Sequence, residues 1–182
     1  MIKCLIISLL SSIPFVDINI TKFIYNIKYT HNLSKFVTKY IIYFNIIVNL
    51  VYLNYTRNFK ELFIRYFTEL IVVNFMFKWV LDRKRPRHSL VNDNYHSIYE
   101  IKFSKIWAEN QSFPSGHVCT IYSTYKILCN TNYFMKLSKI YYFLIYLTIY
   151  ARINLAEHHF SDCIFAILIT KLSRFLLERI IY

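Results

Sequence analysis

Long apolar stretches follow one another along most of the 182 residues, and they constrain the fold more than any other feature. A membrane-spanning helix needs about 20 predominantly apolar residues. With one Gly and three Pro, the chain also lacks the turn residues of a many-stranded β protein. The sequence therefore predicts an all-α, integral-membrane bundle of five to six transmembrane helices. The expected helices cover an N-terminal run, 1–16, and then 36–53, 62–81, 115–128, 137–153 and 160–181.

The N-terminal apolar run has two interpretations. It is short for a membrane span and begins with a basic residue, as the apolar region of a signal peptide does. No convincing small-x-small cleavage site follows it, which favours a short first membrane helix. Behind it, Phe23, Ile24 and Ile27 share one helical face, so we expect an amphipathic helix over 21–33 in the membrane interface. No internal repeat or linker interrupts the chain, which predicts a single domain over 1–182.

The chain is strongly basic, with 22 Lys and Arg against 10 Asp and Glu and a net charge of +12. These charges are spread between apolar stretches, so they favour anionic lipid, or phosphate on a lipid, over nucleic acid. The positive-inside rule predicts which ends face the cytoplasm. We expect a multi-pass protein of a bacterial cytoplasmic (inner) membrane, with the loop 82–113 and the connection between the last two helices facing outward. The basic residues used for this orientation are Arg57, Lys60, Lys136, Lys139, Arg174 and Arg179.

Three polar segments lie where the expected topology places one membrane face. They are K-W-V-L-D-R-K-R-P (78–86), P-S-G-H (114–117) and A-R-I-N-L-A-E-H-H-F-S-D (151–162). Taken singly, each has an ordinary explanation: a basic cluster at a helix end, a Pro-Ser helix start, and a local His–Asp pair four residues apart. Taken together, they supply the parts of a phosphoryl-transfer site.

The cations and donors of such a site come from all three segments. A transferring phosphoryl group spreads negative charge over its oxygens, and the protein must offset that charge. Lys78, Arg85 and Arg152 are the candidate cations. Ser115 and Gly116 lie where a helix N-terminus directs backbone N–H groups at an anion, and the one glycine of the chain permits close approach.

Two histidines and an aspartate supply the catalytic groups. His117 follows Gly116 and is close enough to protonate a leaving-group oxygen. Asp162, four residues after His158, can accept from one ring nitrogen and leave the other free to attack phosphorus. Arg152 lies on another helical face than His158, so a bend within 153–157 is needed to bring both to one pocket.

No cofactor is expected from the sequence. The four cysteines form no C-x-x-C pair and lie in apolar surroundings, which is typical of inert buried thiols. No set of carboxylates or of Cys and His has the spacing of a metal site. We therefore expect fixed positive charges to take the place of a metal ion.

The order K-x6-R-P, P-S-G-H and R-x5-H-x3-D resembles the signature of the type 2 phosphatidic acid phosphatase family, which also includes bacterial acid phosphatases, glucose-6-phosphatase and vanadium haloperoxidases. The resemblance covers residues 78 to 162. It implies that Lys78, Arg85 and Arg152 bind phosphate together with Ser115 and Gly116. It also implies a metal-independent hydrolase with a six-helix bundle and a site near the outer membrane surface.

The resemblance also assigns the catalytic roles. His158 looks like the nucleophile that forms a phosphohistidine, His117 like the general acid, and Asp162 like the partner that orients His158. Ala151 stands where the family usually has a serine before the arginine of the third motif, so one hydroxyl donor is lost.

The sequence thus predicts a membrane phosphatase that acts on a lipid phosphate or pyrophosphate. Candidate substrates are undecaprenyl pyrophosphate, phosphatidylglycerol phosphate, phosphatidate and lipid A phosphates, and the sequence does not choose among these phospholipid and isoprenoid phosphates or predict an oligomeric state. A vanadate-dependent haloperoxidase shares the anion pocket, but its relatives are larger soluble proteins. A non-catalytic membrane protein that binds or carries phosphorylated lipid would need the cations but not the two histidines.

Overall fold

The computed structural model describes residues 16–68, 71, 76–77, 81–87, 100–101 and 111–181. Helices dominate this part of the chain, in agreement with the predicted all-α class. The long helices are α2 (His31–Thr56), α3 (Phe59–Phe67), α6 (Gly116–Cys129), α7 (Met135–Asn154) and α8 (Phe160–Ile181). Short 3-10 turns, η1 (Lys28–Thr30) and η3 (Asn132–Phe134), precede α2 and α7.

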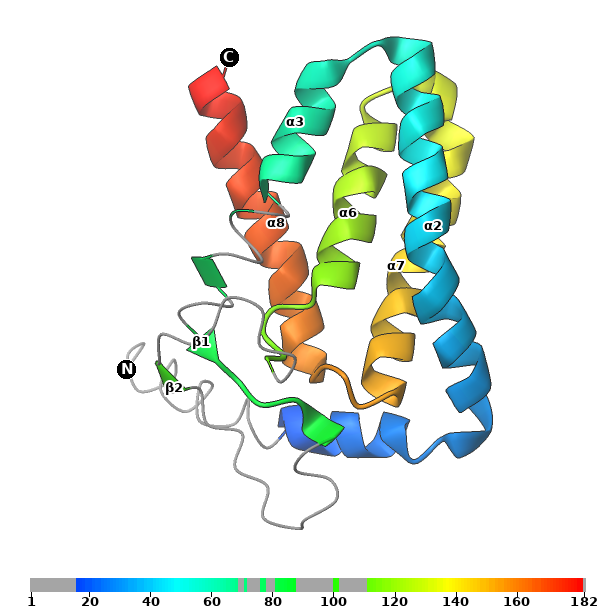
Figure 1. Ribbon diagram of the computed structural model, residues 1–182, viewed down its shortest axis with the longest axis vertical. Coiled ribbons are helices and arrows are strands. Elements are labelled where there is room, and N and C mark those ends of the chain that lie inside the picture. Colours follow the sequence, from blue (N-terminus) through cyan, green and yellow to red (C-terminus); the bar gives the residue numbers. More distant parts are fainter. Residues whose placement is uncertain are drawn as a thin grey trace, which may run out of the picture.

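The long helices form a bundle in which successive members run in opposite directions (Figure 1). α6 occupies the middle and packs against α7, α8, α2 and α3. The start of α6, the end of α7 and the start of α8 therefore lie at one end of the bundle, the lower end in Figure 1. This end carries two of the three polar segments.

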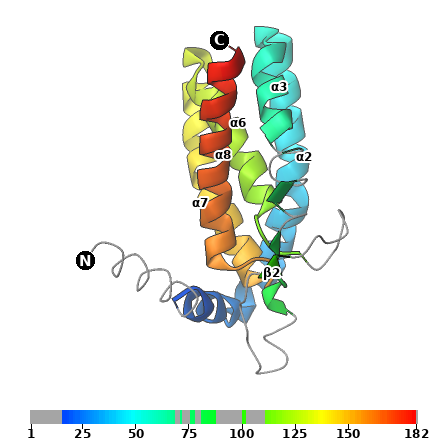
Figure 2. The same ribbon diagram turned by 90° about the vertical axis from the view of Figure 1, so that its left-hand side faces the viewer.

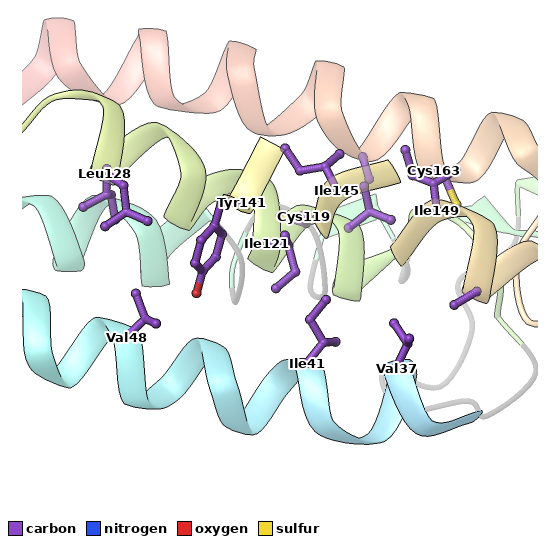
Figure 3. Close-up of a cluster of buried hydrophobic side chains, with 14 of the residues drawn as sticks. Val37, Ile41, Val48, Cys119, Ile121, Leu128, Tyr141, Ile145, Ile149 and Cys163 are labelled. Carbon is purple, nitrogen blue, oxygen red and sulfur yellow. The ribbon is translucent and has the colours of Figure 1, made fainter. Parts of the chain in front are cut away.

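Apolar side chains fill the bundle between α2, α6 and α7. Figure 3 shows Val37, Ile41 and Val48 of α2 facing the side chains of α6 and α7. Cys119 and Ile121 of α6 are fully buried there, as expected for the central helix. Burial of these apolar groups supplies the main favourable free energy of helix packing in water, and close contact supplies it in a lipid environment.

Polar side chains also join helices within the bundle. Tyr141 of α7 points its hydroxyl toward α2 (Figure 3), where it donates to Asn45 Oδ1 at 3.1 Å. Ser34 of α2 donates to Asn154 Oδ1 of α7 at 2.8 Å. Hydrogen bonds of this kind between small polar residues are typical of helix contacts in membranes.

The outer surface of the bundle is apolar. Large apolar side chains of α2, α7 and α8 are exposed over the length of each helix. They include Phe36, Tyr40, Ile47, Leu50, Ile140, Phe143, Leu168, Leu172 and Leu176. An apolar exterior around an interior that holds hydrogen-bonded Ser, Asn and Tyr side chains favours surroundings of lipid over water.

The described residues support some of the predicted membrane spans better than others. Among the described residues, one helix, Lys28–Thr56, is long and apolar enough to cross a membrane by length and composition. α6 has 14 residues, about 21 Å at 1.5 Å per residue, and is shorter than a typical hydrocarbon core. The expected first span, 1–16, lies almost wholly outside the described residues, as does much of the second half of the expected span 62–81.

The expected amphipathic helix over 21–33 is wrong in its bounds. Residues 16–25 are helical and lie across the end of the bundle in both views (Figure 2), and the chain turns at 26–27 before η1. Phe23 is exposed, whereas Asp17 and Thr21 are fully buried. The buried face is polar because both side chains bind the start of α8, where Thr21 Oγ1 accepts from the backbone N–H of Phe160.

Two very short β-strands pair in and next to the polar loop 82–113, which the sequence did not predict. Two-residue strands β1 (Leu81–Asp82) and β2 (Glu100–Ile101) pair antiparallel. An isolated bridge joins Lys84 to Gln111. The two ends of the loop are thus held together beside the start of α6.

Candidate active site

Backbone hydrogen bonds join the three polar segments at the lower end of the bundle in Figure 1. Arg87 N, one residue beyond the first segment, donates to Ala156 O at 3.0 Å and so links the first segment to the third. Ser115 N donates to Asp162 O at 3.3 Å, which links the second segment to the third. These bonds fix the relative positions of the side chains that the sequence assigned to one site.

A sharp turn between α7 and α8 confirms the bend that the sequence required within 153–157. α7 ends at Asn154, and Ala156 has a left-handed backbone with φ of 52°. The carbonyl of Arg152 accepts from the N–H groups of both Glu157, at 3.1 Å, and His158, at 3.3 Å. The turn thus folds Glu157 and His158 back onto the end of α7 that carries Arg152.

The His158 ring is held by a backbone carbonyl. Its Nδ1 lies 2.5 Å from Ser112 O, and the side chain is almost completely buried. A carbonyl oxygen only accepts hydrogen bonds, so Nδ1 carries the proton and Nε2 carries the lone pair. This is the tautomer that a nucleophilic Nε2 requires.

Asp162 does not make the hydrogen bond to His158 that the sequence predicted. The distance from His158 Nδ1 to Asp162 Oδ2 is 3.9 Å. Asp162 Oδ2 instead accepts from His159 N at 2.8 Å, and Oδ1 is paired with Arg83. The carboxylate still places a negative charge next to the imidazole, where it stabilises positive charge on the ring.

Arg83 and Asp17 are site residues that sequence reasoning missed. The Arg83 guanidinium bridges Asp162 and Asp17, with Nη2 to Asp17 Oδ2 at 2.5 Å. Asp17 Oδ1 accepts from Ser161 N at 2.7 Å, and Arg83 donates to Ser161 Oγ at 2.7 Å. Arg83, Asp17 and Asp162 are each at most 2% exposed. The only signal in the sequence was a lone aspartate at the end of an apolar run.

Two of the three predicted cations lie together, and a third arginine accompanies them. Arg85 pairs with Glu157 Oε2, and Arg152 Nη2 lies 3.6 Å from the same oxygen. Arg87 Nη1 contacts the other oxygen, Oε1, at 3.1 Å. The predicted cation Lys78 lies outside the described residues.

The P-S-G-H segment opens α6 as predicted. Ser115 is the N-cap residue, with an extended backbone at φ −75° and ψ 106°, and Gly116 begins the helix. Gly116 has no positive φ, so the backbone at this position does not itself require a glycine. His117 is partly exposed in the first turn, at the bundle end where α8 also begins.

His159, next to His158 in the third segment, is buried in the structure. Its Nε2 donates to Lys84 O at 3.3 Å, which ties α8 to the first segment. Burial, together with the nearby charge of Arg83, lowers the pKa of His159 from its usual 6.5 to about 3. The imidazole is therefore neutral at physiological pH.

Among the described residues, no group of three or more His, Cys, Asp or Glu side chains is arranged to hold a metal ion. No curated protein matches the chain, and no solved structure matches it. The family model of the PAP2 superfamily matches residues 62–181, which is more than half of the chain and includes all three polar segments. The chain therefore belongs to the PAP2 superfamily, and this membership supports phosphatase activity on a phosphate ester.

Proposed function

We propose that this protein is a membrane phosphatase that removes phosphate from a lipid phosphate or pyrophosphate through a phosphohistidine on His158. The observation that supports this most is the hydrogen bond from His158 Nδ1 to Ser112 O, which leaves the lone pair on Nε2. Arg85 and Arg152 lie at the turn that carries His158 and supply positive charge for a phosphate. Ser115 and Gly116 at the start of α6, and Lys78, complete the proposed phosphate site.

The proposed reaction has two steps. His158 Nε2 attacks phosphorus, a P–N bond forms, and the P–O bond to the leaving group breaks while His117 donates a proton to the leaving oxygen. His117 then takes a proton from water, the resulting hydroxide attacks the phosphohistidine, and the P–N bond breaks to release inorganic phosphate. Between the two steps, Asp162 stabilises the positive charge on the phosphorylated imidazole of His158. The arginines offset the charge on the phosphoryl oxygens, so no metal ion is required.

The surroundings favour a substrate with a lipid tail. The apolar exterior of α2, α7 and α8 supports a multi-pass membrane protein of one domain, and the site lies at the end of the bundle. A lipid can keep its tail beside such a bundle while its phosphate enters from the membrane surface. We propose an inner-membrane location with the site facing outward. The candidate substrates are undecaprenyl pyrophosphate, phosphatidylglycerol phosphate, phosphatidate and lipid A phosphates.

The proposal is tested by phosphate release from these four lipids by the purified protein in detergent with EDTA. We expect release from at least one of them, and loss of release in His158→Ala. His31→Ala is the matched control, since His31 lies in α2 and bonds Tyr25 O outside the proposed machinery. Equal turnover by wild type and His158→Ala would show that His158 is not the nucleophile. Binding of a phosphorylated lipid without release of phosphate would favour a non-catalytic binding or carrier protein.

A further inference from the structure

A carboxylate occupies the centre of the arginine cluster. Glu157 Oε2 is shared between Arg85, with which it makes a short ion pair, and Arg152 Nη2 at 3.6 Å. Its other oxygen contacts Arg87 Nη1 at 3.1 Å. One anionic group thus engages three guanidinium groups from two segments of the site.

The position of this carboxylate is the position expected for a substrate oxygen. Arginine binds carboxylate and phosphate with the same forked geometry, so an oxygen that lies between Arg85 and Arg152 marks where a phosphoryl oxygen would be held. Glu157 directly precedes His158, and its backbone N–H donates to Arg152 O at 3.1 Å. The main chain therefore keeps the carboxylate within reach of both arginines.

We propose that Glu157 is an internal competitor for phosphate, and this inference rests on the proposed phosphate site. Its carboxylate contacts Arg85 and Arg152, and an incoming phosphate binds them only by displacing it. The displacement weakens binding of every phosphate, including the inorganic phosphate that the reaction releases. Glu157 thus limits product inhibition and occupation of the site by the phosphodiester headgroups of bulk lipid.

The structure provides a path for this displacement. Glu157 is 19% exposed, and Arg87, which contacts its Oε1, is 41% exposed at the edge of the cluster. Rotation of the flexible glutamate side chain toward Arg87 releases Oε2 from Arg85 and Arg152 while one ion pair remains. A fully buried carboxylate without an outer partner would have no such alternative position.

The test is binding of inorganic phosphate and of dimethyl phosphate, measured by calorimetry on full-length protein in detergent. We expect Glu157→Gln to bind both anions about tenfold more tightly than wild type, because neither has to displace a charge. We expect a gain for the monoanion as well as for the dianion, because both must displace the carboxylate from Arg85 and Arg152. A gain confined to inorganic phosphate, unchanged binding, or weaker binding would each overturn the proposal.

Two further variants make the result specific. Glu178→Gln removes a carboxylate that pairs with Arg174 Nε at 2.6 Å elsewhere on α8, and we expect wild-type phosphate binding. Glu157→Ala is a second neutral variant in case Glu157→Gln does not fold, with the same expected gain. Because binding requires no turnover, failure of the proposed hydrolysis leaves this measurement intact. If the protein hydrolyses a lipid phosphate but Glu157→Gln and Glu157→Ala bind inorganic phosphate with wild-type affinity, the competitor role is wrong and the proposed hydrolysis stands.

Discussion

The Nδ1 atom of His158 lies 2.5 Å from the backbone carbonyl oxygen of Ser112, 46 residues earlier in the chain. Ser112 stands two positions before the P-S-G-H motif, so the loop that leads into α6 holds the ring that the turn between α7 and α8 carries. Since the acceptor is a backbone atom, no substitution of the Ser112 side chain removes it. The consequence is that the tautomer of the proposed nucleophile, His158, is set by the fold of the loop.

We predict that Arg83 is essential for stability. Arg83→Ala leaves Asp17 and Asp162 buried without their shared counter-charge, and loss of one partner of a buried ion pair costs about 3–5 kcal/mol. Chemical unfolding in detergent micelles measures this loss. Lys84→Ala is the neighbouring control, because the Lys84 side chain is exposed and its contacts to His159 and Ser112 use the backbone carbonyl. Equal stability of Arg83→Ala and wild type would contradict the bridging role.

A second prediction concerns acid stability and His159. Its pKa is lowered to about 3 in the folded protein, whereas the unfolded chain takes up the proton near the usual value of 6.5. Between these values the unfolded state binds more protons, so the stabilising contribution is present above pH 6.5 and is lost as the pH falls toward 3. His159→Gln keeps an N–H donor but does not titrate. We expect its free energy of unfolding to depend less steeply on pH, by about 1.4 kcal/mol per unit at most. The same slope in both proteins would contradict the assignment.

A third prediction tests the orientation in the membrane. Tyr29 in η1 and Tyr133 in η3 are exposed tyrosines in matched short turns at opposite ends of the bundle. In a Cys4→Ser, Cys129→Ser background, which removes the exposed thiol among the described cysteines and the one cysteine outside the described residues, we expect Tyr29→Cys to react with an impermeant maleimide in intact cells. Tyr133→Cys should react only after the membrane is opened. The reverse pattern would place the site on the cytoplasmic side.

The helices of the bundle could be predicted from the sequence because apolar periodicity reports local burial. The expected helix 137–153 corresponds to α7 (Met135–Asn154), and 160–181 corresponds to α8. The buried polar face of residues 16–25 could not be predicted in this way, because Asp17 and Thr21 are buried by contacts with the start of α8, more than 100 residues away. A pattern within one segment contains no information on such a distant partner.

Some features of the candidate site could likewise be predicted from the sequence, and others could not. The six-residue spacing of Arg152 and His158 places them on different helical faces, so a common pocket required a bend, which Ala156 makes. Asp162 was predicted to bind the His158 ring because the two residues lie four apart in the sequence. In the structure the Asp162 carboxylate pairs with Arg83, and the His158 ring bonds the backbone carbonyl of Ser112. Glu157 between the arginines was also missed, since an acidic residue is not expected in a phosphate site. These contacts depend on the loop 82–113, whose course has no periodic signal.

The chemical position of the phosphate on the trapped enzyme tests the central proposal most directly. The protein is quenched in alkali during turnover of a ³²P-labelled lipid phosphate, because phosphohistidine is stable in base and lost in acid, and the labelled peptide is then identified. The proposed mechanism predicts phosphate on His158 at Nε2, because Nδ1 carries the proton that Ser112 O accepts. Phosphate on Nδ1, on another residue, or on no residue during demonstrated turnover would contradict it.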